Sequence, residues 1–134
     1  MCYYLPMKDR ITLQTGAQPT KEELMTAYFI IKYDKNVKIR FLAASQAKGA
    51  RTPDIEMNGL KWEIKRPTSN SKYTVQHAFK AAVKQSPNVI FDLRCSKLHQ
   101  ENALNRLIHE FNLSRAVKRL LIITKSKKIL DYNK

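Results

Sequence analysis

The spacing of hydrophobic residues predicts a helix near the start of the chain. Residues 1–19 contain turn-forming residues and predict an irregular lead-in, with a short strand at RITLQ. Thr20 and Glu23 then form a capping-box pair, the sequence signature of a helix N-terminus. Apolar residues follow at i, i+3, i+4 and i+7, which predicts a helix over residues 20–33. Its predicted buried stripe comprises Leu24, Ala27, Tyr28 and Ile31.

A strand and a tight hairpin are predicted next. VKIRFLA, residues 37–43, alternates apolar and basic residues, as a half-buried strand does. Asn58-Gly59 is a strong hairpin signal, and a two-residue loop there fixes the register of the flanking strands. That register gives the hairpin an apolar face of Ile55, Met57, Leu60, Trp62 and Ile64, and a polar face of Asp54, Glu56, Lys61, Glu63 and Lys65.

The C-terminal half predicts two helices among three strands. TVQHAFKAAVKQ has an apolar helical stripe that Pro87 ends, and NVIFDL predicts a strand covered on both faces. A second helix places Leu104, Leu107, Ile108 and Phe111 on one face, and the strands RLLIIT and KKILDY follow. The predicted order is α-β-β-β-α-β-α-β-β. We therefore expect an α/β or α+β fold with a mixed sheet in a three-layer core.

Composition narrows the possible functions. A chain of 134 residues, 43% hydrophobic and 27% charged, predicts a single domain over residues 1–134. No apolar stretch is long enough for a membrane span, and the N-terminus lacks the pattern of a secretory signal, so we expect a site of action in the cytoplasm. The 25 basic and 11 acidic residues give a net charge of +14, which favours nucleic acid as the partner over a basic surface without a polyanionic ligand.

The polar face of the hairpin carries the candidate chemistry. Asp54 lies opposite Glu63, and two facing carboxylates repel each other unless a cation lies between them. Lys65 shares that face. Hard divalent cations prefer oxygen ligands, and a metal with a lysine beside it suits phosphodiester hydrolysis. The alternative is an ordinary solvated strand face, since Glu-x-Lys is a common pattern on alternating strands.

Other reactive residues show weaker patterns. The three histidines lack the spacing of a zinc site, and neither Cys2 nor Cys95 has a partner for a disulfide or a metal. Cys95 is predicted to be a packed thiol. Asp92, at the end of an apolar strand, is predicted to start a loop, and the alternative is a group that supports the site from behind the residues that touch the substrate. Tyr3, Tyr4 and Tyr73 are possible stacking partners for bases, although half-buried core positions are the alternative.

TPDIEMNGLKWEIKRP resembles the PD-(D/E)XK motif of the restriction-endonuclease-like superfamily, with Asp54, Glu63 and Lys65 at the motif positions. The stretch QHAFKAAVKQSPNVIFDLR is similar to the CdiA C-terminal tRNA nuclease toxins of contact-dependent growth inhibition. This resemblance implies a restriction-endonuclease-like sheet flanked by helices, a divalent metal such as Mg²⁺ or Mn²⁺ on Asp54 and Glu63, and cleavage of tRNA. It also implies a cognate immunity protein, and the net charge of this chain favours an acidic one. The resemblance further implies an acidic residue in the first helix, which matches Glu23 or, less well, Glu22.

Toxin domains of this type usually end long exported chains, so we expect either an excised domain or a stand-alone relative. Gln85, near the end of a helix, is a candidate for facing the substrate. Basic candidates for gripping its backbone are Arg66, Lys118, Arg119, Lys125, Lys127 and Lys128. Two other functions stay open at this point, a DNA endonuclease of the same superfamily and a catalytically inert basic module that binds nucleic acid.

Overall fold

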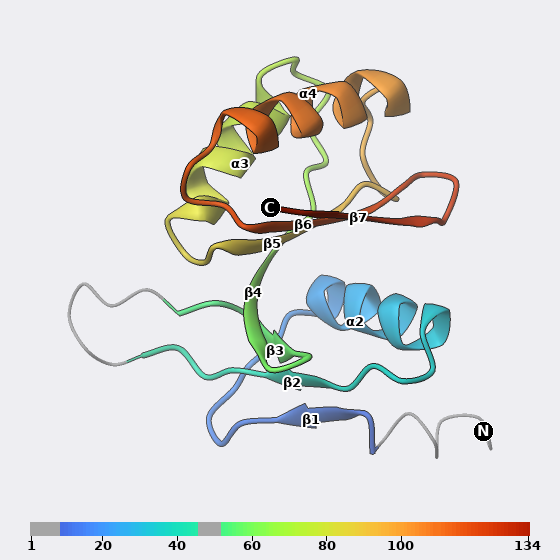
Figure 1. Ribbon diagram of the computed structural model, residues 1–134. Coiled ribbons are helices and arrows are strands. Elements are labelled where there is room, and N and C mark those ends of the chain that lie inside the picture. Colours follow the sequence, from blue (N-terminus) through green and yellow to red (C-terminus); the bar gives the residue numbers. More distant parts are fainter. Residues whose placement is uncertain (1–8, 46–51) are drawn as a thin grey trace. The chain divides into compact units, whose positions relative to one another are not determined.

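The computed structural model describes residues 9–45 and 52–134, and the chain divides into two units within strand β4 (Leu60–Lys65) (Figure 1). The first unit is residues 1–62 and the second is residues 63–134. Cys2, Tyr3 and Tyr4 lie outside the described residues, so the predictions for them have no structural counterpart. No helix among the described residues has both the length and the apolar character that crossing a bilayer requires.

The first unit contains helix α2 (Lys21–Tyr33) and the strands β1 (Ile11–Leu13), β2 (Ile39–Phe41) and β3 (Ile55–Met57). Strands β1 and β2 are parallel, and β2, β3 and β4 are antiparallel. The predicted capping box is present, because Glu23 N–H donates to Thr20 Oγ1 at 3.1 Å and Thr20 N–H donates to Glu23 Oε1 at 2.8 Å. The prediction for Tyr28 is wrong. It is 37% exposed, and Ile30 takes its place in the buried stripe.

The hairpin forms in the predicted register. Asn58 and Gly59 both have positive φ, 54° and 76°, as a two-residue turn whose twist matches its strands requires. Ile55 pairs with Trp62 and Met57 with Leu60. Ile55, Met57 and Trp62 are buried, and the indole N–H of Trp62 donates to the Met57 carbonyl at 3.1 Å. Packing on the apolar face thus stabilises the turn that the local sequence specifies.

The second unit begins with the end of β4 and adds α3 (Thr74–Val83), β5 (Asn88–Asp92), α4 (Gln100–Leu113), β6 (Arg119–Ile123) and β7 (Ile129–Asn133). Strands β4, β5 and β6 are parallel, and β7 is antiparallel to β6. Figure 1 shows α3 and α4 on the same side of β5, β6 and β7. The core between them includes Phe79, Phe91, Leu107, Phe111 and Leu120. All five residues of β5 are buried, as predicted.

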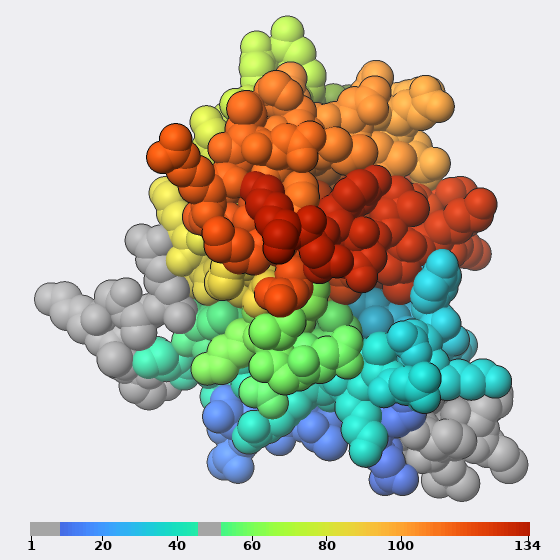
Figure 2. Space-filling view, viewed as in Figure 1, coloured from blue at the N-terminus to red at the C-terminus, as the bar shows by residue number. Residues whose placement is uncertain are grey.

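Strand pairing follows the order β1-β2-β3-β4-β5-β6-β7, so the sheet is mixed, and among the described residues three helices accompany it. This confirms the predicted α+β class and the predicted order, and β1 forms within the short strand predicted at RITLQ. The three-layer core and the single domain stay predictions. In the space-filling view of Figure 2, β7 and the turn before it (red) lie on the surface of the second unit beside α4 (orange).

Candidate active site

Glu63 and Lys65 form an ion pair on strand β4. The lysine Nζ lies 3.5 Å from Glu63 Oε2, as expected for residues i and i+2 on one face of a strand. Glu63 is only 7% exposed, so the solvated strand face that alternation alone suggested is wrong for this residue. Strand β5, which is buried along its whole length, pairs alongside, with Val89 opposite Glu63. A carboxylate is seldom buried in this way unless charge compensates it, which Lys65 supplies.

Asp54 lies in the first unit, just before β3. Its backbone is held from both sides, because Asp54 N–H donates to the Trp62 carbonyl at 3.0 Å and its own carbonyl accepts from Leu42 N–H at 3.0 Å. The residue is half-buried. These bonds extend the hairpin ladder by one step and fix the direction in which the Asp54 side chain leaves the backbone.

Asp54 and Glu23 line one pocket of about 610 Å³ within the first unit. Thr52, Pro53 and Phe41 contribute to the same lining. The first helix therefore presents its acid to the pocket that also holds the aspartate of the motif. Glu23 caps α2 through Oε1, and because a carboxylate has two oxygens and about four lone-pair sites, capping leaves it able to accept a further ligand.

The carboxylates present suit a hard divalent cation. Among residues 9–45 and 52–134, no group of three or more His, Cys, Asp and Glu side chains is arranged to enclose a metal by itself. Mg²⁺ ordinarily uses one or two protein carboxylates and keeps several waters, so it does not need such a cage. Asp54 and Glu23, sharing a pocket, offer oxygen donors of the right kind.

A second buried carboxylate, Asp92, ends strand β5. It stands where a loop begins, as predicted, since β5 ends at Asp92 and Arg94 N–H donates to its Oδ1 at 3.1 Å, but its side chain is also fully buried and ion-paired. Arg94 NH2 lies 2.8 Å from Asp92 Oδ2, and Arg66 Nε lies 3.4 Å from the same oxygen. The hydrogen bond from Arg94 to Asp92 raises the pKa of Arg94, outweighing burial, which lowers it. The guanidinium of Arg94 is therefore firmly positive beside Asp92.

Arg66 is itself mostly buried, and its side chain is 10% exposed. Its Nη2 donates to Cys95 Sγ at 3.3 Å, while its Nη1 is buried without a hydrogen-bond partner among the described residues. Cys95 is exposed, so the packed thiol predicted for it is wrong. Sequence reasoning missed this cluster, although one signal was available, since Asp92 and Arg66 both stand at the carboxyl ends of neighbouring parallel strands.

The remaining candidates lie elsewhere on the second unit. Gln85 is half-buried in the turn after α3, where its N–H donates to the Ala82 carbonyl. Three of the basic candidates make hydrogen bonds within the unit, Lys118 to Arg115 O, Arg119 to Asn88 Oδ1 and Lys125 to Leu98 O. Lys127 and Lys128 are exposed in the turn between β6 and β7. Tyr73, at the start of α3, is 52% exposed, which removes the core alternative for it.

The chain is similar to a known protein family in sequence and to a solved structure in fold. No curated protein matches the sequence. The solved structure of a CdiA-CT/CdiI toxin and immunity complex from Burkholderia pseudomallei is similar, with a TM-score of 0.59, 16% sequence identity, and coverage of 92% of this chain and 99% of that one. At that identity the similarity is one of fold. The model of a family described as the contact-dependent growth inhibition CdiA C-terminal domain matches residues 51–129, more than half of the chain, including Asp54, Glu63 and Lys65. The chain therefore belongs to the CdiA C-terminal domain family.

Proposed function

We propose that this chain is a nuclease toxin domain that hydrolyses phosphodiester bonds in RNA, with tRNA as its substrate. The observation that carries the proposal is the buried Glu63 paired with Lys65 inside the segment that matches the family. A strongly desolvated carboxylate beside a lysine is more typical of a reactive site than of a solvated strand face. The fold neighbour's description as a toxin is consistent with this proposal.

The residue roles follow the PD-(D/E)XK resemblance. Asp54 and Glu63 are proposed to hold a divalent cation, Mg²⁺ or Mn²⁺, and Glu23 to contribute from the first helix. When bound, such an ion activates water and polarises the phosphoryl group. Lys65 supplies a fixed positive charge for the negative charge that develops on the phosphate oxygens, and its pairing with Glu63 keeps the ammonium in place.

The net charge of +14 supports the choice of a polyanionic substrate. RNA is preferred over DNA because the resemblance is to tRNA nucleases. The same charge supports an acidic cognate immunity protein as partner, because complementary fields steer association. The fold neighbour was solved as a toxin and immunity complex, which agrees with such a partner. Cleavage of tRNA would place the action of the toxin in the cytoplasm of the target cell.

A cleavage assay tests the proposal directly. Purified protein is incubated with total tRNA and with plasmid DNA, in Mg²⁺, in Mn²⁺ and in EDTA. We expect discrete tRNA fragments that require the divalent cation. Asp54→Asn should abolish them, whereas the matched variant Asp131→Asn, which removes an exposed carboxylate from β7, should cleave like the wild type.

Each other outcome has a definite meaning. Cleavage of plasmid DNA alone would retain the site and replace the substrate, giving a DNA endonuclease. Cleavage that persists in EDTA would remove the metal from the proposal. Absence of cleavage on both substrates, with tRNA binding intact in Asp54→Asn, would leave a basic binding module and contradict catalysis.

A further inference from the structure

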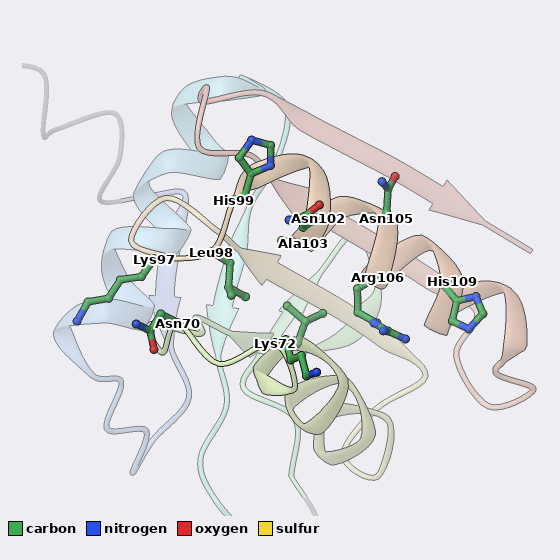
Figure 3. Close-up of a pocket in the computed structure, with 11 residues that line it drawn as sticks. Asn70, Lys72, Lys97, Leu98, His99, Asn102, Ala103, Asn105, Arg106 and His109 are labelled. Carbon is green, nitrogen blue, oxygen red and sulfur yellow. The ribbon is translucent and has the colours of Figure 1, made fainter.

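A second pocket, of about 750 Å³, lies within the second unit on the surface of α3 and α4 (Figure 3). One wall is a single face of α4, since His99, Asn102, Arg106 and His109 recur every three or four residues. The opposite wall is the segment that leads into α3, with Asn70 and Lys72. The floor is apolar, formed by Val75, Leu98 and Ala103. None of the motif residues contributes to this lining.

The charge of this pocket is positive. Lys72, Lys97 and Arg106 line it, and in the described part of the chain the lining contains no carboxylate. Arg106 shares its charge with Glu110, 3.8 Å away on the next turn of α4. Lys72 and Lys97 are exposed, so both ammonium groups can meet a ligand in the pocket without losing a buried partner. A cationic lining around an apolar floor suits an anionic ligand with flat apolar groups.

The polar residues of the lining add hydrogen-bonding capacity. Asn70, Asn102 and Asn105 each carry a donor and an acceptor group, the pair that base edges require. Next to Lys72 in the chain, Tyr73 is 52% exposed and stacks on His77, with ring centroids 6.2 Å apart and an angle of 21° between the planes. The ammonium of Lys72 lies over the Tyr73 ring, 5.1 Å from its centroid, so a stacked base would take the place of this exposed lysine. Exposed aromatic rings are the usual platform on which unpaired bases stack.

We infer that this pocket binds an unpaired segment of the RNA substrate, apart from the residues proposed to cut it. Lys72, Lys97 and Arg106 contact phosphates, the asparagines contact base edges, and Tyr73 stacks on one base. The inference rests on the proposed function, because it gives the nuclease a means of selecting RNA with exposed loops over regular duplex. Above the buried Val75 and Ala103, the half-buried side chain of Leu98 offers an apolar contact to the flat face of a base, which a duplex keeps stacked inside.

Lys125 connects the basic turn of the second unit to this pocket. Its ammonium donates to the carbonyl of Leu98, a floor residue, at 3.2 Å. In the same turn, Ser126 N–H donates to Gln100 Oε1 at 3.1 Å, so the turn between β6 and β7 is attached to the start of α4. The positive charges of Lys127 and Lys128 thus belong to a turn held against this end of the pocket, where they can extend the interaction with the RNA backbone.

Binding measured without cleavage tests the inference. Fluorescence anisotropy in EDTA follows a labelled single-stranded RNA and the same sequence annealed into a duplex, and a gel confirms that the RNA stays intact. The pair Lys72→Gln/Lys97→Gln should weaken single-strand binding about tenfold and lower the salt slope by about 1.4, at roughly 0.7 for each phosphate that a lysine no longer neutralises. The matched pair Lys35→Gln/Lys80→Gln removes two exposed charges outside the pocket and should change the affinity less than about threefold.

Tyr73→Ala provides an independent readout. It should weaken single-strand binding about tenfold, the effect of removing the platform for one stacked base, and leave duplex binding unchanged. The inference would be overturned if the two double lysine variants lost RNA affinity equally, or if neither lost any. The same absence of a specific effect on RNA is expected if the pocket binds an acidic protein instead. If the cleavage assay fails while the pocket variants still lose RNA binding, the proposed function falls and the binding site stands. Normal cleavage with no change in binding defeats the binding site alone.

Discussion

Glu63 is held almost out of water, with Lys65 as its compensating charge 3.5 Å away. Removing a carboxylate from water costs free energy, and an ion pair in such a place contributes little to stability compared with a hydrophobic pair of the same volume. Stability alone therefore gives a weak account of why an acid occupies this position between Trp62 and Ile64. A role in chemistry, where a desolvated charge acts strongly on a substrate, gives a better one.

Glu63→Gln separates these two roles. The amide keeps the size of the side chain and removes only its charge, so we expect tRNA cleavage to fall at least about a hundredfold. The free energy of unfolding should change by no more than about 1 kcal/mol, because an amide costs less to bury than a carboxylate, which offsets the lost pairing with the partly solvated Lys65. Initial cleavage rates and urea unfolding measure the two effects.

Glu56→Gln is the matched control, since Glu56 lies on the neighbouring strand of the same hairpin and pairs in register with Lys61. It should leave cleavage unchanged. If Glu56→Gln lost as much cleavage as Glu63→Gln, the loss would come from the overall charge of the hairpin and not from Glu63 itself. Unfolding of Glu63→Gln under assay conditions would instead assign Glu63 a structural role.

Asp92 is the opposite case, a buried acid whose removal should chiefly affect stability. Its carboxylate is fully buried and serves both Arg66 and Arg94. Asp92→Asn leaves two guanidinium groups without a countercharge, one of them on a side chain only 10% exposed, and should lower the free energy of unfolding by about 3 kcal/mol. Urea denaturation of the variant, compared with Asp131→Asn on exposed β7, measures the difference, and the control should stay within about 0.5 kcal/mol of wild type. Similar stabilities in the two variants would contradict the assigned role.

At the scale of elements, the start of α2 carries a residue with two possible tasks. Glu23 accepts the Thr20 N–H as part of the capping box and also lines the pocket that contains Asp54. Glutamine satisfies a capping box as well as glutamate does, because its amide oxygen accepts the same hydrogen bond. Glutamine lacks the negative charge with which a carboxylate attracts a divalent cation, so it is the weaker ligand.

Glu23→Gln should therefore leave the melting temperature nearly unchanged and reduce tRNA cleavage at least tenfold, with part of the loss recovered at higher Mn²⁺ concentration. Thermal denaturation and a metal titration of the cleavage rate measure these effects. Thr20→Ala supplies the converse change, since it removes the cap hydroxyl and should cost about 1 kcal/mol of stability. Full activity in Glu23→Gln would confine Glu23 to capping.

The elements that were predicted correctly are those specified by residues that lie close together in the sequence. Asn58-Gly59 specifies its own turn, and Thr20 and Glu23 cap a helix across three residues. The errors concern Tyr28, Cys95 and the burial of Glu63, and the burial of Asp92 was not foreseen, because burial depends on how the elements pack. Arg66 reaches Cys95 across 29 positions, and no local pattern predicts that hydrogen bond. The shared face of Glu63 and Lys65 followed from strand alternation, although their ion pair was not predicted. The shared pocket of Glu23 and Asp54 requires β2, β3 and α2 to come together.

For the whole molecule, the net charge of +14 makes binding to a polyanion sensitive to salt. Each phosphate that a lysine or arginine neutralises releases condensed counterions, so affinity falls as salt rises. The exposed charges are spread over the chain, including Lys72 and Lys97 at the pocket and Lys127 and Lys128 in the turn between β6 and β7. Neutralisation of about five phosphates is a modest expectation for such a protein.

Neutralising about five phosphates predicts that log K for tRNA falls against log salt with a slope of about −4 to −5. Anisotropy titrations between about 50 and 200 mM KCl, in EDTA so that the RNA stays intact, measure this slope. A slope near zero would mean that the protein neutralises few phosphates, and that result would argue against nucleic acid as the substrate. Asp54→Asn should bind tRNA at least as tightly as wild type, because it removes a negative charge from the cutting site while leaving the phosphate-binding residues intact. A variant that loses both cleavage and binding would indicate that Asp54 supports the fold, so unfolding curves accompany the titration.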